Sequence, residues 1–152
     1  MANFIELFTS FHGRISRQSW WLGTVILFPL SIAGAALLDP ARYSLVSSVV
    51  LPPNLAATIW SLLVVFPMTA ITVKRFNDRD WPNWLGYGYG LIASVQIIAL
   101  HFGFLAGPVM STRETIAIAI FGSLGLFIVI VNGFLRGTSG PNRYGPDPLS
   151  SA

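Results

Sequence analysis

The stretch Lys-Arg-Phe-Asn-Asp-Arg-Asp-Trp-Pro-Asn-Trp at residues 74–84 is the densest run of charge in the chain. Long apolar segments lie on both sides of it, and Pro82 stops any helix that would run through it. A short charged run between two apolar helices is typical of a connection at a membrane surface. We therefore predict that residues 74–84 form a cytoplasmic elbow between two membrane-spanning helices.

The composition of the chain indicates a membrane protein. Of its 152 residues, 53% are hydrophobic and only 10% are charged, whereas soluble domains carry about 25% charged residues. The mean hydropathy is +0.66. The chain has no cysteine, which excludes disulfides, thiolate catalysis and cysteine-based zinc or iron–sulfur sites.

Four long apolar segments predict four membrane-spanning helices. None of them contains Asp, Glu, Lys or Arg, and ~20 residues at about 1.5 Å per residue cover the ~30 Å hydrocarbon core. A cleaved signal peptide is the rival interpretation of the first segment, but its apolar run is long for one. The predicted spans are residues 19–38, 55–73, 84–106 and 115–135.

The predicted fold is all-α, a four-transmembrane-helix bundle that forms a single membrane domain over residues 1–152. Phenylalanines such as Phe4 and Phe8 follow helical spacing, which predicts a short N-terminal amphipathic helix ended by Gly13. This helix either lies in the lipid headgroup region or packs on the protein. The cytoplasmic tail, residues 136–152, is too rich in Gly and Pro for regular structure and is predicted to form irregular turns.

Capping and small residues mark helix starts and close contacts. Ser16 and Asn54 stand where N-caps are needed, because a side-chain oxygen there accepts hydrogen bonds from the first free backbone amides.

Glycines in a membrane helix usually mark a close approach of two helices. The third span contains the run Tyr87–Gly90, and the fourth contains Gly122 and Gly125. Both spans are therefore expected to pack closely against a neighbour.

The basic residues predict the orientation of the chain. Of its nine Lys and Arg residues, seven fall on one predicted side of the membrane and two on the other. Because an excess of Lys and Arg marks the cytoplasmic side, both termini and the elbow are expected in the cytoplasm. The seven are Arg14, Arg17, Lys74, Arg75, Arg79, Arg136 and Arg143, and the two are Arg42 and Arg113.

Three segments of the chain resemble one bacterial family. They are Phe11–Arg17 followed by Trp20, the elbow, and Gly137–Pro148. They resemble the Gly-Arg-x-Ser-Arg entry, the basic-basic-x-x-Asp elbow and the Asn-x-Tyr-Gly-x-Asp-Pro tail of the family called domain of unknown function 805. The resemblance implies a small four-span, multi-pass protein of the bacterial inner (plasma) membrane. It implies no activity, because the family has none assigned.

The elbow departs from the pattern of that family. Asn77 stands where the family usually has histidine, and Trp81-Pro82-Asn83 replaces a common Ser-Gly-Trp. If the family histidine transfers protons, this chain cannot do so at that position.

The residue types that support catalysis are dispersed along the chain. His12 is predicted at the inner surface and His101 near the outer end of the third span, so the two cannot form a pair. A cation site at Asp78, Asp80 and Asp147 is a weaker interpretation than neutralisation of nearby arginines. We therefore expect no enzyme activity, no catalytic residue, no metal and no cofactor.

The spans also bear on transport. Their lack of ionisable residues disfavours a proton-coupled carrier. The alternative function is that of a subunit of an oligomeric channel or small-solute transporter.

The candidate site is a basic, aromatic-rimmed cytoplasmic face. One interpretation is structural, with Asp78 and Asp147 bridging arginines from different segments. The other is that the face binds anionic lipid headgroups or a protein partner. The expected partners are membrane lipids, a membrane protein or a second copy of the chain, and not nucleic acid. The residues of the face are Arg14, Arg17, Arg75, Asp78, Arg79, Asn142, Arg143, Tyr144 and Asp147.

Overall fold

The computed structural model describes residues 4–43, 51–105 and 111–150. Within these ranges the chain is all-helical, with one isolated β-bridge and no strand, which confirms the predicted class. The helices are α1 (Phe4–Thr9), α2 (Arg17–Leu38), α3 (Leu55–Asp78), α4 (Trp84–His101), α5 (Thr112–Val129) and the π-helix η1 (Ile130–Phe134), which continues α5.

Side-chain caps fix the starts of α2, α3 and α5. Ser16 accepts a hydrogen bond from a first-turn amide of α2 at 3.2 Å, and Asn54 does the same for α3 at 2.8 Å, as predicted. Ser111 and Glu114 form a capping box at α5, in which each side chain binds the backbone amide of the other residue. These caps set where each apolar helix begins.

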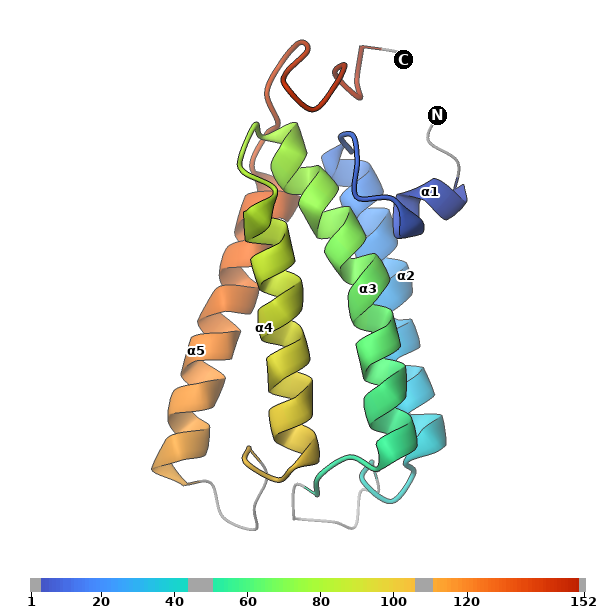
Figure 1. Ribbon diagram of the computed structural model, residues 1–152, viewed down its shortest axis with the longest axis vertical. Coiled ribbons are helices and arrows are strands. Elements are labelled where there is room, and N and C mark those ends of the chain that lie inside the picture. Colours follow the sequence, from blue (N-terminus) through green and yellow to red (C-terminus); the bar gives the residue numbers. More distant parts are fainter. Residues whose placement is uncertain (1–3, 44–50, 106–110, 151–152) are drawn as a thin grey trace.

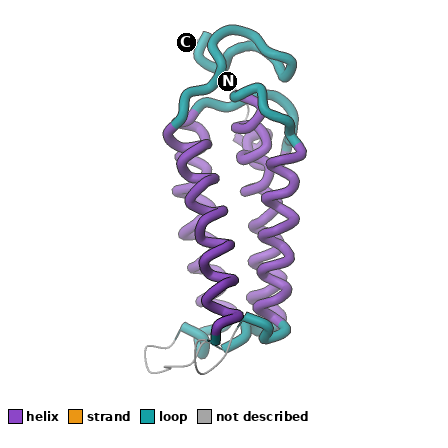
Figure 2. Tube along the Cα trace, turned by 90° about the vertical axis from the view of Figure 1, so that its left-hand side faces the viewer, coloured by secondary structure: helices purple, strands orange, loops and turns teal. Residues whose placement is uncertain are grey.

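The four long helices lie side by side along the long axis of the molecule, with α1 crossing one end (Figure 1). Helix α3 packs on both α2 and α4, while the last helix contacts α2 and α3 through η1. The tail lies beyond the same end as α1 and the α3–α4 connection, as the side view confirms (Figure 2). Segments from the start, middle and end of the chain therefore meet at one end of the helices.

Glycines permit the close packing of α3 and α4. A Cβ on Gly86 would collide with the backbone of Val73, and one on Gly90 would collide with the Thr69 side chain. The close contact expected at Gly122 and Gly125 is not found within the described residues, since no neighbouring atom lies within 4 Å of a Cβ position there. The predicted fourth span instead approaches α2 at Gly133, where a Cβ would collide with the Trp21 ring.

Three helices are long and apolar enough to cross a membrane: Arg17–Leu38, Leu55–Asp78 and Thr112–Phe134. Large apolar side chains point outward from them, and Val25 is 63% exposed. A surface of this kind suits lipid as the solvent, so the chain has the helices of a membrane protein. Helix α4 lies beside them with 18 residues but includes Gly, Tyr, Gln and His, so a membrane crossing by α4, the third predicted span, stays a prediction.

The elbow is shorter than predicted. Helix α3 continues through Asp78, so residues 74–78 are helical and buried instead of forming a surface connection. The connection to α4 consists of residues 79–83. The polar side chains of residues 74–78 tolerate burial because most of their polar atoms have hydrogen-bond partners inside the protein.

Other predicted boundaries also shift. Helix α1 ends at Thr9, and Gly13 lies in the loop that follows, where its φ of 85° suits glycine. Helix α4 ends at His101, while the predicted limit, Ala106, lies outside the described residues. Helix α5 begins at Thr112, earlier than predicted, because the capping box provides its start.

Helix α1 packs on the protein. Leu7 is buried against the core, and Lys74 Nζ donates hydrogen bonds to the carbonyl oxygens of Glu6 and Leu7 at 2.6 and 2.7 Å. Phe4 and Ile5 remain 61% and 65% exposed on the outer side of the helix. Of the two interpretations of this helix, the structure therefore favours packing on α3.

Candidate functional site

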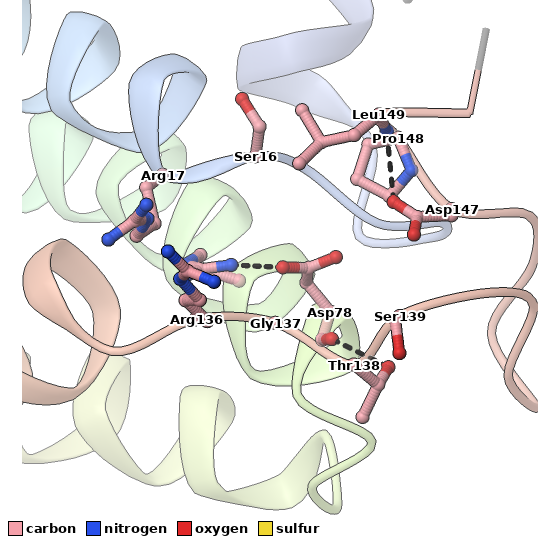
Figure 3. Close-up of a pocket in the computed structure, with 11 residues that line it drawn as sticks. Ser16, Arg17, Asp78, Arg136, Gly137, Thr138, Ser139, Asp147, Pro148 and Leu149 are labelled. Atoms are coloured by element: carbon pink, nitrogen blue, oxygen red, sulfur yellow. Dashed lines mark hydrogen bonds and ion pairs between the residues drawn. The ribbon is translucent and has the colours of Figure 1, made fainter.

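Asp78, in the last turn of α3, joins three segments of the chain. Its Oδ1 accepts a hydrogen bond from Arg14 Nε at 3.1 Å, and its Oδ2 pairs with Arg75 one turn earlier. Its backbone oxygen accepts from the amide and hydroxyl of Thr138 at 2.8 and 3.0 Å. Figure 3 shows this contact, with the tail running past the end of α3. Asp78 thus connects the loop before α2, helix α3 and the tail.

Arg75 is completely buried. Its Nε donates to the carbonyl oxygen of Asn132 at 2.7 Å, and its Nη2 donates to that of Leu135. A buried guanidinium is tolerated only when its donors and charge are matched. Arg75 meets this condition and fixes α3 to the end of the last helix.

Arg14 connects the N-terminal loop to the tail. Besides the ion pair with Asp78, its Nη1 donates to the carbonyl oxygen of Gly140 at 2.7 Å, and its Nη2 donates to that of Thr138 at 2.6 Å. Its side chain is only 1% exposed. The planar fork of arginine suits several acceptors at fixed angles, so Arg14 holds the tail turns in position.

Asn142 holds the tail on α3 as well. Its Nδ2 donates to the carbonyl oxygen of Asn77 at 2.9 Å and to Thr138 Oγ1 at 3.0 Å, while its Oδ1 accepts from the amide of Tyr144. Asn77 Nδ2 in turn donates to the carbonyl oxygen of Gly13 at 3.1 Å. We call the following residues the Asp78 cluster: Arg14, Arg75, Asp78, Thr138 and Asn142.

Five predicted site residues lie outside this cluster, namely Arg17, Arg79, Arg143, Tyr144 and Asp147. Arg143 forms an ion pair with Asp80 at 3.1 Å, with the two side chains 55% and 45% exposed, and its guanidinium lies over the Tyr144 ring. Exposed ion pairs contribute about 0–1 kcal/mol. Arg143 and Tyr144 therefore form a separate surface pair.

Two further arginines fasten the end of the last helix. Arg17 Nη1 donates to the carbonyl oxygen of Phe134 at 3.0 Å, and Arg79 Nη1 donates to that of Arg136 at 2.8 Å. The Arg79 guanidinium also lies 5.0 Å from the Trp81 ring centroid, and its burial lowers the pKa of Arg79. Both arginines therefore bind backbone carbonyl oxygens where η1 ends and the tail begins.

Asp147 stabilises the turns of the tail. Its carboxylate accepts hydrogen bonds from the backbone amides of Leu149 and Gly140, both at 2.9 Å. These amides hold the pKa of Asp147 below its usual value. Asp147 thus binds backbone amides in place of the arginine bridge expected for it.

Several residues of the site were not predicted from the sequence. Thr138 both donates to Asp78 and accepts from Arg14. Gly137 is required because a Cβ there would collide with the Asp78 carboxylate. Asn132 and Leu135 contribute only carbonyl oxygens, which no side-chain pattern reveals.

The histidines lie at opposite ends of the helices. His12 precedes α2, and His101 ends α4, where its Nδ1 lies 3.0 Å from Thr58 Oγ1 and 3.1 Å from the carbonyl oxygen of Pro53. His101 is thus a hydrogen-bonded residue that joins α4 to the start of α3.

The chain belongs to the family described as "Protein of unknown function (DUF805)", whose model matches residues 8–146. This match confirms the resemblance carried by the entry, elbow and tail motifs. No curated protein and no solved structure matches the chain. In this chain, the three motifs meet around Asp78.

Proposed function

We propose that this member of the DUF805 family is a non-enzymatic, four-span protein of the bacterial inner membrane with both termini in the cytoplasm. The Asp78 cluster holds the inner ends of the helices and the tail together. The cluster thereby keeps a basic, aromatic-rimmed face in a fixed shape toward the headgroups of membrane lipids, which are its partners.

The burial of Arg75 carries this proposal. Removing a guanidinium from water is unfavourable unless its charge and donors are matched. Arg75 matches them with Asp78 and with carbonyl oxygens of Asn132 and Leu135, which belong to the end of the last helix. A structural role therefore explains why charge lies inside an apolar chain.

The hydrogen bonding of the polar groups supports the non-enzymatic part of the proposal. Asp78 is engaged by Arg14 and Arg75, and Asp147 by two backbone amides. Groups that are already paired in this way serve architecture better than catalysis, which needs convergent reactive groups facing a substrate.

Folded yield tests the structural role of Arg75. Arg75→Met removes the buried guanidinium, and Arg143→Met removes an exposed one with the same loss of charge. We expect the monodisperse fraction in detergent to fall for Arg75→Met and to stay at the wild-type level for Arg143→Met. Equal yields of the two variants would refute the structural role.

Thiol labelling tests the spans and the orientation, because the chain has no native cysteine. A membrane-impermeant reagent applied to intact inner-membrane spheroplasts should label Arg42→Cys and Arg113→Cys but not Ser150→Cys. Labelling of Ser150→Cys alone would show the opposite orientation. Labelling of Arg42→Cys and Ser150→Cys without Arg113→Cys would show that α4 does not cross the membrane.

A further inference from the structure

A pocket of about 250 Å³ lies between the start of α2, the end of the last helix and the tail. Figure 3 shows Arg17 and Arg136 on one side of it and Asp147 on the other. The pocket is smaller than the ~300–1,000 Å³ that encloses a whole drug-sized ligand. Its size therefore suits one polar group of a larger molecule. We call it the tail pocket.

The basic side of the tail pocket has hydrogen-bond donors to spare. Among residues 4–43, 51–105 and 111–150, the Arg17 guanidinium makes one hydrogen bond, from Nη1 to the carbonyl oxygen of Phe134. The exposed Arg136 side chain makes no hydrogen bond or ion pair to any residue that the structure describes. Guanidinium groups bind phosphate oxygens with geometric fit. In contrast to Arg14 and Arg75, these two arginines are free to hold an external anion.

The acidic side limits which anions fit. Asp147 accepts two backbone hydrogen bonds, while a carboxylate has about four acceptor positions. Because Asp147 lines the pocket, its remaining acceptor positions are available to a cationic group, and its charge repels a second negative group. A ligand with a phosphate at one end and an ammonium at the other matches both sides of the pocket.

The pocket lies at the level of lipid headgroups. Arg17 opens the apolar helix α2, and the Trp21 ring, one turn further, packs edge-on against Phe134 at 5.8 Å between centroids. Tryptophan at the start of a span favours the boundary between hydrocarbon and water. The Phe134 side chain is 62% exposed beside this contact. A phospholipid beside α2 would therefore bring its headgroup to the pocket.

We infer that the tail pocket binds the phosphoethanolamine headgroup of a membrane phospholipid, with the phosphate at Arg17 and Arg136 and the ammonium at Asp147. The inference rests on the proposed membrane orientation and names the lipid chemistry that the cytoplasmic face selects. It assigns a role to Arg136, which the Asp78 cluster does not use.

Native mass spectrometry of the protein in detergent tests the inference, with equimolar phosphatidylethanolamine, phosphatidylglycerol and phosphatidylcholine added. The wild type should retain phosphatidylethanolamine over the other two. Arg136→Gln should reduce that retention about fivefold, while the control Arg143→Gln, an exposed arginine outside the pocket, should leave it unchanged. Asp147→Asn should abolish the preference for phosphatidylethanolamine over phosphatidylglycerol.

Equal retention by the wild type and Arg136→Gln would overturn the inference, and so would an unchanged preference in Asp147→Asn. Thermal unfolding of Arg136→Gln should match the wild type, because the side chain has no hydrogen bond or ion pair to lose within the described part of the chain. Equimolar soluble phosphoethanolamine should not displace the lipid, because it lacks the acyl chains beside α2. Displacement at equimolar concentration would identify the free group as the ligand. The structural role of Arg75 is tested by folded yield without added lipid, whereas the lipid site is tested by lipid retention. Either proposal can therefore be refuted while the other stands.

Discussion

Arg14 and Asp78 form an ion pair of 3.1 Å although they lie 64 positions apart in the chain. Their side chains are only 1% and 5% exposed. A buried pair contributes little net stability over an apolar pair, but removal of one partner leaves an uncompensated charge inside the protein. The pair therefore makes the loop before α2 and the end of α3 depend on each other.

Asp78→Asn should lower the free energy of unfolding by about 3–5 kcal/mol, because Arg14 and Arg75 both lose their counter-charge. Denaturant titration in mixed micelles, followed by tryptophan fluorescence, measures this change. Asp80→Asn is the matched control, since it makes the same substitution in an exposed ion pair and should cost at most about 1 kcal/mol. A similar cost for both substitutions would count against the special role of Asp78.

Lowering the pH should loosen the turns of the tail, because protonation of the Asp147 carboxylate weakens its hydrogen bonds to the Gly140 and Leu149 amides. Because its folded-state pKa is below the ordinary value of 3.8, its contribution is present above that value and is lost as the pH falls through the lowered pKa. Protection of the Gly140 and Leu149 amides from hydrogen exchange, corrected for intrinsic rates, should be constant from neutral pH to mild acid and then fall. Asp147→Asn should lack this acid step, and an identical step in the variant would exclude Asp147 as its cause.

Gly137→Ala should destabilise the contact of the tail with α3, because the added methyl group meets the Asp78 carboxylate. We expect a cost of about 1–3 kcal/mol, typical of overpacking. Gly122→Ala provides the control, since nothing in the described structure lies within 4 Å of its added Cβ and alanine favours a helix. A neutral Gly137→Ala would show that the tail has room to shift away from α3.

Much of the helical architecture follows from the sequence. The uncharged runs predicted the apolar helices, and the oxygen side chains of Ser16 and Asn54 predicted where α2 and α3 begin. These features are local, because a cap or an apolar run depends on a few neighbouring residues. The end of α3 was misjudged because residues 74–78 read as solvent-exposed charge, whereas long-range contacts bury them.

The membership of the candidate site was only partly predictable. Charge and family motifs identified Arg14, Arg75 and Asp78, but the acceptors of the arginines are mostly backbone carbonyl oxygens. Every residue has such an oxygen, so side-chain identity does not show which ones bind. Asp147, the aspartate of the tail motif, was expected to bridge arginines as Asp78 does, but its carboxylate accepts hydrogen bonds from nearby backbone amides.

The central claim is that Arg14 and Asp78 act as one unit that holds together the end of the helices that carries the tail. A double-mutant cycle measures this directly, using the unfolding free energies of Arg14→Gln, Asp78→Asn and the double variant in mixed micelles. We expect the double variant to cost less than the sum of the single variants by about 1–3 kcal/mol. Single costs that add to within about 0.5 kcal/mol would contradict the claim, since additivity is the behaviour of independent sites.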